Sequence, residues 1–227
     1  MKLSLPKKDL IEYIENLILA NFPDGIKINS SQLRDMVENA ILRTEVSFQN
    51  IEAKYYLKDG AVYFNHLNAD HMIVLLYFAA NSGYKLGYEI NLIEKIYNLN
   101  KRLHSIDLFY SINLPEVFCV VHPLGSILGN AKYGNYMCIY QGVTIGSTKK
   151  ESYPEFGNRV ILCSNSSVIG KCKVGNNIIF ATNSFVLNKD IPDNSIVVGR
   201  HPNVKIMPIS KNQLAEIKVE VIFKNSI

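Results

Sequence analysis

The stretch Ile139–Ser147, which reads IYQGVTIGS, belongs to a ladder of apolar residues that recurs every six positions. A six-residue period fits neither an α-helix nor a simple alternating strand. It is the repeat of a parallel β-helix, in which each short strand forms one face of a triangular coil of roughly 18 residues. The ladder residues are expected to fill the centre of the stack, and they are Tyr133, Ile139, Ile145, Phe156, Leu162, Val168, Val174, Phe180 and Val186.

The ladder is interrupted once, by the polar segment 147–155. This segment contains Lys149, Glu151, Tyr153 and Pro154. A loop that leaves a rigid coil at one corner commonly forms the wall of a binding site.

Helical periodicity dominates the first hundred residues. Apolar residues at helical spacing predict helices over about 10–22, 29–41, 70–83 and 87–104. Asn68 or Asp70 is expected to open the third helix, and the apolar face of the fourth is expected to carry Ile90, Ile93 and Tyr97. Asn29, with Gln32 three residues later, is expected to cap the second helix. The turn signal Asp59-Gly60 predicts a hairpin between 54–57 and 61–64.

These patterns predict an α+β protein with three parts. An α-helical N-terminal domain covers 1–105, a β-helix covers 106–209, and a tail covers 210–227. The tail contains the alternating stretch Glu216–Phe223 beyond the last repeat, and its structure stays open at this point.

The composition of the chain argues against several classes of protein. A chain of 227 residues with 48% hydrophobic and 19% charged residues is an ordinary globular protein. The net charge of +4 is too small and too diffuse to favour nucleic acid. No apolar run reaches the ~18 residues of a membrane span, and the first residues lack a secretory core. The four cysteines form no C-x-x-C pair, so reduced thiols and a cytoplasmic location are expected.

His122 is the candidate general base. It lies near the start of the ladder, and Asp107 precedes it by fifteen residues, about one coil. Residues one coil apart become neighbours, so Asp107 could accept a hydrogen bond from one ring nitrogen and leave the other free to take a proton. The residues alone leave two alternatives open: a structural histidine beside a proline, and a coincidental spacing to Asp107.

From Asp107 to Pro208 the chain resembles bacterial serine acetyltransferases and their relatives in the hexapeptide-repeat family. The resemblance rests on three segments: His122–Gly125 (HPLG), Gln141–Gly146 (QGVTIG) and Ile191–Gly199 (IPDNSIVVG). It implies a left-handed parallel β-helix, acetyl-CoA as cosubstrate, His122 and Asp107 as a catalytic pair, and a homotrimer or a dimer of trimers.

The same resemblance implies the binding residues. The acceptor would meet Gln141, Tyr153 and Val121. Asp70 lies outside the resemblance and is the residue of the helical domain expected to hold serine if serine is the acceptor. The CoA part of the donor would run along the β-helix past Gly146, Ser147, Ser164 and Ala181, with Arg200 and Lys205 near its phosphates. Small residues at these positions also suit tight coil corners.

Two departures from the family bear on the acceptor. Val121 stands where the family has an aspartate for the amino group of L-serine, and Tyr153 stands where it has a histidine near the carboxylate. Because an apolar side chain cannot replace a charge-assisted hydrogen bond worth about 1.5–3 kcal/mol, a sugar hydroxyl of surface polysaccharide biosynthesis is expected as the acceptor. The alternative is L-serine O-acetylation in cysteine biosynthesis.

Two further readings compete with an acetyltransferase. A zinc enzyme on a β-helix needs three histidines from adjacent coils. His122 and His201 are too few and too far apart, so no metal is expected. A non-catalytic scaffold is opposed by the set Asp107, His122 and Gln141.

Overall fold

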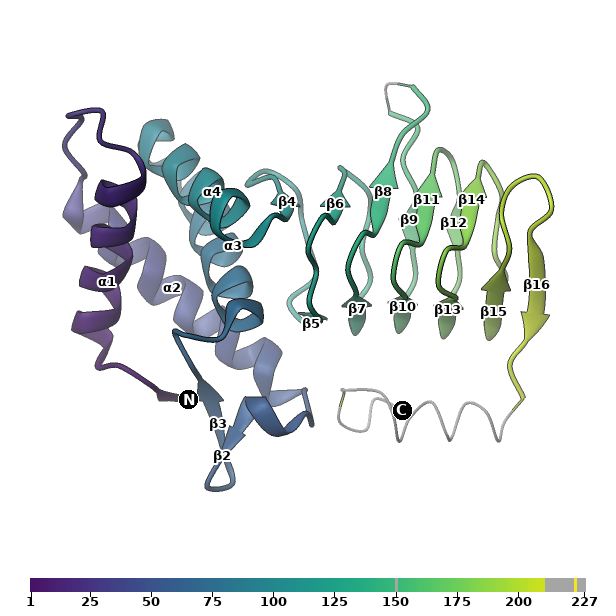
Figure 1. Cartoon of the computed structure of the whole chain (residues 1–227), viewed down its shortest axis with the longest axis horizontal. Coiled ribbons are helices and arrows are strands. Elements are labelled where there is room, and N and C mark those ends of the chain that lie inside the picture. Colours follow the sequence, from purple (N-terminus) through teal and green to yellow (C-terminus); the bar gives the residue numbers. More distant parts are fainter. Residues whose placement is uncertain (150, 211–222, 224–227) are drawn as a thin grey trace.

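The computed structural model describes residues 1–149, 151–210 and 223. Helices gather at one end of the molecule, and a stack of short strands extends from them (Figure 1). The predicted order of a helical region followed by a β-helix is confirmed.

The helical region contains α1 (Lys7–Asn21), α2 (Ser30–Gln49), α3 (Ala69–Leu86) and α4 (Ile90–His104). The expected cap of α2 is present, because Asn29 Oδ1 accepts a hydrogen bond from Gln32 N at 3.3 Å. A small sheet flanks the helices, with β3 (Ala61–Phe64) between β1 (Lys2–Leu3) and β2 (Leu57–Lys58). The predicted hairpin is therefore present, although Lys54–Tyr56 forms the 3-10 helix η1 instead of a strand.

Two helix details differ from the sequence prediction. α3 runs past Gly83 to Leu86 and ends at Gly87, which has the left-handed φ of 70° typical of a helix C-terminus. Gly83 instead marks a close approach of α2, since a Cβ there would lie 2.5 Å from Met36 Cε. In α4 the side chain of Ile90, predicted to face the core, is 51% exposed. The buried apolar residues of α4 are Leu92, Ile93, Ile96 and Leu99.

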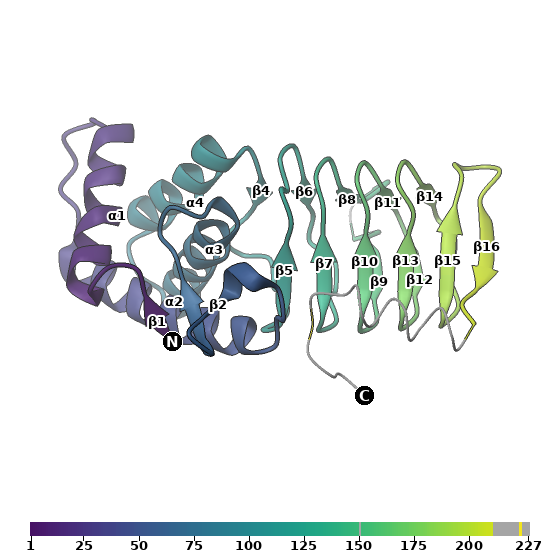
Figure 2. The ribbon, with the colours of Figure 1, turned by 60° about the horizontal axis from the view of Figure 1, so that its bottom comes forward.

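The β-helix has three faces of parallel strands (Figure 2). The first face comprises β5 (Phe118–Val120), β7 (Met137–Ile139), β10 (Val160–Leu162), β13 (Ile178–Phe180) and β15 (Ser195–Val198). The second comprises β4 (Asp107–Leu108), β6 (Ile127–Leu128), β8 (Thr144–Gly146), β11 (Ser167–Ile169) and β14 (Phe185–Leu187). The third pairs β9 (Glu155–Phe156) with β12 (Lys173–Val174).

The six-residue ladder fills the centre of this stack, as predicted. On the first face Ile139, Leu162 and Phe180 lie in register and are fully buried. Ile145, Val168 and Val186 do the same on the second face, with at most 1% exposure. The interruption is also where it was expected, between the end of β8 and the start of β9. The apolar column therefore sets the register of the coils.

The corners between the first and second faces follow a regular pattern. Gly142, Asn165 and Asn183 succeed one another in coil register, and each has a positive φ, between 57° and 67°. Asparagine tolerates this left-handed conformation better than other non-glycine residues, because its short polar side chain bonds locally. Each of these corners is four residues long, as in 140–143.

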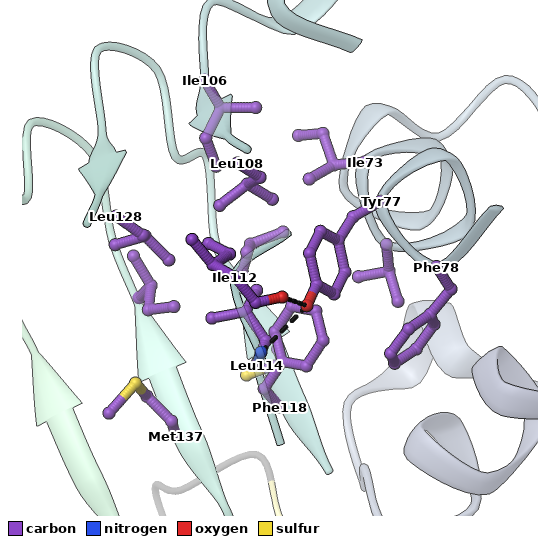
Figure 3. Close-up of a cluster of buried hydrophobic side chains, with 14 of the residues drawn as sticks. Ile73, Tyr77, Phe78, Ile106, Leu108, Ile112, Leu114, Phe118, Leu128 and Met137 are labelled. Carbon is purple, nitrogen blue, oxygen red and sulfur yellow. Dashed lines mark hydrogen bonds between the residues drawn. The ribbon is translucent and has the colours of Figure 1, made fainter. Parts of the chain in front are cut away.

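The helical region packs on the first coil through α3 (Figure 3). Tyr77 of α3 lies among Ile112, Leu114 and Phe118, and its hydroxyl donates to Ile112 O at 2.8 Å. The same hydroxyl accepts the N–H of Leu114 at 2.9 Å. This contact fixes the middle of α3 relative to the β-helix, and the N-terminal turn of the same helix reaches the site described below.

At the other end of the stack β16 (Lys205–Pro208) turns back antiparallel to β15. Within residues 1–149, 151–210 and 223, no helix is long and apolar enough to cross a membrane. The open question about Glu216–Phe223 falls outside the described residues except at Phe223, which is buried and makes an edge contact with Tyr136.

Candidate functional site

His122 lies in an enlarged corner of the first coil. The corner from Val120 to Ile127 comprises residues 121–126, two more than the four-residue corners above it. Gly125 is the residue in register with Gly142 and takes the regular left-handed position. His122 is a second left-handed residue, with a φ of 48°, and it is exposed. The two extra residues therefore make the corner that presents this imidazole to solvent.

A carboxylate of the helical region reaches this corner. Asp70, in the first turn of α3, accepts the backbone N–H of His122 with its two side-chain oxygens at 3.3 and 3.4 Å. Burial raises the pKa of Asp70, while the His122 N–H and the charge of the His122 ring act in the opposite direction. Asp70 is thus a half-buried acid close to the candidate base.

Asp107 does not occupy the predicted place. Its carboxylate accepts hydrogen bonds from Tyr97 Oη at 2.7 Å and Lys101 Nζ at 2.6 Å, both on α4. The expected hydrogen bond from the His122 ring to the Asp107 carboxylate is absent from the described contacts. The reason is register: Asp107 pairs with Ile127, which lies twenty residues on, because the first coil is longer than the fifteen residues assumed.

Three of the predicted residues line one edge of the β-helix. His122, Gln141 and Ser164 each stand two positions after a first-face strand residue, and those strand residues are in register. Ala181 lies at the same corner one coil further, in register with Cys163 and one position before the residue that corresponds to Ser164. Arg200 forms a parallel β-bridge with Phe185 at the end of the stack. Each coil adds about 4.8 Å, so the edge from His122 to Arg200 extends for roughly 19 Å.

Lys205 lies at the same end as Arg200. It is exposed and pairs with Val198 across β15 and β16, two residues before Arg200. Two cations therefore lie at the end of this edge that is remote from His122.

The remaining predicted residues lie elsewhere in the coil. Val121 is half-buried against the core and donates its N–H to Ile139 O. Gly146 and Ser147 lie at the far end of the second face, where Gly146 allows Ile169 of the next coil to approach. The ring of Tyr153 packs against Gly129, because a Cβ there would lie 3.0 Å from Tyr153 Cε1. About three strand residues, or roughly 10 Å, separate Gly129 from the His122 corner.

Sequence reasoning missed the residues that hold Asp107. Tyr97 was assigned only to the apolar face of α4, and Lys101 was not singled out. Their spacing of four residues, which places both on one helix face near the chain entry to β4, was the available signal.

The described part of the chain contains no group of three or more His, Cys, Asp or Glu side chains that could hold a metal ion. All four cysteines are free, and burial raises the pKa of Cys119, Cys163 and Cys172, which disfavours a reactive thiolate.

The comparisons with known sequences identify serine acetyltransferases. No family model matches the chain. The serine acetyltransferase of Synechococcus elongatus is 30% identical over 81 residues, which are 34% of this chain and 33% of that protein. The serine acetyltransferase of Staphylococcus epidermidis is 30% identical over 83 residues, 35% of this chain and 39% of that protein. The matches thus span a little over a third of these curated relatives at most.

Solved structures with the same fold cover far more of the chain. Vibrio cholerae serine acetyltransferase superposes with a TM-score of 0.67 at 18% identity, covering 92% of this chain and 84% of that one. Neisseria gonorrhoeae serine acetyltransferase in complex with serine gives 0.63 at 20% identity, covering 84% and 81%. At these identities the superpositions establish the fold.

The fold and the partial sequence matches lead to one conclusion. The helical region, the β-helix and the order in which they follow one another are those of the superposed structures, and the sequence matches are to serine acetyltransferases. The chain has the fold of solved serine acetyltransferases, and about a third of it is similar in sequence to proteins of that name.

Proposed function

We propose that this protein is an acetyl-CoA-dependent O-acetyltransferase. The observation that carries the proposal is the position of His122, an exposed imidazole on an enlarged corner at one end of an edge that ends in two cations. The similarity to serine acetyltransferases supports the same reaction class.

In the proposed reaction His122 takes the proton of the acceptor hydroxyl. The oxygen attacks the carbonyl carbon of the thioester, and the C–S bond of the tetrahedral intermediate then breaks. The protonated imidazole returns its proton to the departing CoA thiolate, so that acetyl ester and CoA thiol are the products. A positioned base of this kind contributes about 10²–10⁴-fold to the rate.

The donor would lie along the edge that begins at His122. Ser164 and Ala181 are small, so an extended chain can approach their backbone groups closely. Arg200 and Lys205 would meet the phosphates at the far end, where a planar guanidinium can form paired hydrogen bonds. Gly146 and Ser147 lie on the other side of the second face, so within one subunit they would not contact this donor.

L-serine is the acceptor that the comparisons favour. The sequence matches are to serine acetyltransferases, and one superposed structure is described as a complex with serine. A sugar hydroxyl, expected from Val121 and Tyr153, is the second candidate. Its support is that Val121 is half-buried, packs against the core and offers no charge to an amino group. Gln141, exposed in coil register with His122, would contact either acceptor.

The site would be completed by a neighbouring copy of the chain. Tyr153 and His122 lie at opposite ends of β6, so one chain does not bring them together. We therefore propose a closed trimer, in which the outer faces of three β-helices meet and the two ends of the second face come from different subunits.

Release of CoA from acetyl-CoA, measured with L-serine, homoserine and a set of nucleotide sugars, tests the proposal. His122→Ala should lower kcat at least about 10²-fold while acetyl-CoA still raises the thermal stability. His201→Ala is the matched control, because it removes another exposed β-helix histidine at the opposite end of the stack. Near-normal turnover in His122→Ala, or an equal loss in both variants, would remove His122 from the mechanism.

A further inference from the structure

The first turn of α3 touches the corner that holds His122, and this contact crosses from the helical region to the β-helix. Asp70 contributes its carboxylate, and His122 contributes its backbone N–H, 3.3 and 3.4 Å from the two oxygens. Asp70 follows the N-cap of α3, Asn68, whose side chain accepts the N–H of His71. Asp70 lies two residues after this cap, in the first turn of α3, and its carboxylate reaches the corner.

The conformation of His122 needs an explanation that the coil repeat does not supply. The regular corner position is taken by Gly125, in register with Gly142 and two asparagines. His122 has a φ of 48°, in the left-handed region that residues with a Cβ disfavour. Such a conformation persists where surrounding contacts impose it. Within the corner, His122 O accepts the N–H of Leu124 at 2.8 Å. The hydrogen bond from His122 N to Asp70 is a contact that the helical region adds to this backbone.

Asp107, the carboxylate that the sequence predicted as the partner of His122, is hydrogen-bonded to α4 instead. Asp107 accepts hydrogen bonds from Tyr97 and Lys101 and stacks beneath Ile127. Asp70, in contrast, accepts a hydrogen bond from the His122 backbone, and its carboxylate also interacts electrostatically with the His122 ring.

We propose that Asp70 is the positioning residue for His122, holding the corner in the conformation that presents the imidazole to the acceptor hydroxyl. The catalytic consequence rests on the proposed function, and the structural part does not. The helical region thereby takes part in acetyl transfer, because α3 sets the backbone of a base that belongs to the β-helix.

Three variants separate this role from general loosening of α3. Asp70→Ala removes both the acceptor and the charge, whereas Asp70→Asn keeps an oxygen that can accept the His122 N–H. Asn68→Ala is the matched control, since it removes the helix cap without touching His122.

Two measurements are made on the full chain. Steady-state CoA release should show kcat reduced at least about 10-fold in Asp70→Ala with KM for acetyl-CoA unchanged, partial recovery in Asp70→Asn, and less than about 2-fold change in Asn68→Ala. Amide hydrogen exchange should show faster exchange at His122 in Asp70→Ala only. The N–H of His122 can be measured separately from its neighbours, because Pro123 has no N–H and the N–H of Val121 is hydrogen-bonded to Ile139 O.

A failure of the positioning role can be distinguished from a failure of the proposed function. If the unmodified protein released no CoA with any acceptor, the proposed function would fail, and hydrogen exchange would still test the contact. Unchanged exchange at His122 in Asp70→Ala, or equal losses of kcat in Asp70→Ala and Asn68→Ala, would overturn the positioning role.

Discussion

Removing one oxygen atom from Tyr77 should measurably weaken the junction between the helical region and the β-helix. Tyr77→Phe keeps the ring, which is 1% exposed, and deletes the hydroxyl that donates to Ile112 O and accepts from Leu114 N. The carbonyl of Ile112 keeps a second donor, Asn81 Nδ2 at 3.0 Å. The N–H of Leu114 keeps none among the described contacts, and Leu114 is 5% exposed.

The cost follows from this asymmetry. A buried N–H without an acceptor costs about 1–3 kcal/mol, while the lost bond to Ile112 is partly compensated. We expect the free energy of unfolding to fall by about 2 kcal/mol. For a chain of this length that corresponds to a Tm lower by roughly 4–8 °C.

Thermal and urea unfolding at one fixed protein concentration measure the effect, because association shifts the apparent stability. Tyr88→Phe is the matched control: its hydroxyl donates to Asp35 at an exposed position, where such changes cost less than about 0.5 kcal/mol. Equal Tm values for the two variants would refute the argument that the Tyr77 hydroxyl satisfies a buried backbone group.

Three further predictions concern the interior, the pH dependence and the donor. Gly134→Ala would place a Cβ against Gly157 O, so the neighbouring coils must separate. We expect the free energy of unfolding, measured in urea, to fall by about 3 kcal/mol. For Gly25→Ala, where a Cβ meets nothing within 4 Å, we expect a loss of about 1 kcal/mol. Burial lowers the pKa of His71 from 6.5 to about 4, so between these pH values the unfolded chain binds a proton that the folded chain excludes. The free energy of unfolding should therefore fall as the pH drops from 6.5 to 4, by up to about 1.4 kcal/mol per pH unit. His71→Gln should remove this pH dependence. Arg200→Gln should raise KM for acetyl-CoA about 5-fold with kcat unchanged, and an unchanged KM would place the phosphates elsewhere.

The β-helix could be predicted from the sequence because its signal is local and repeated. Ladder residues such as Ile139, Leu162 and Phe180 must point inward in every coil, so the six-residue period carries the register of the whole stack. The helix caps at Asn29 and Asn68 were equally local. The buried face of α4 was less predictable, because the tertiary contacts that leave Ile90 exposed are not encoded in its own periodicity.

The site was harder to predict because its geometry depends on the length of one corner and on a distant helix. The fifteen-residue spacing of Asp107 and His122 assumed a regular coil, whereas the longer first coil pairs Asp107 with Ile127. Asp70 was expected only as a residue of the helical domain that could hold serine. Its contact with His122 joins residues 52 apart in the chain, which no periodicity reveals. The catalytic and binding roles of all these residues stay predictions.

The most direct test is a competition in one reaction. Acetyl-CoA is mixed with the unmodified protein, L-serine, homoserine and nucleotide sugars at equal concentrations, and the acetylated products are identified by mass spectrometry and compared with the CoA released. We expect one predominant O-acetylated product, O-acetylserine, formed in equal amount to CoA and lost in His122→Ala. CoA release without any acetylated hydroxyl, or product formation that His122→Ala leaves intact, would contradict it.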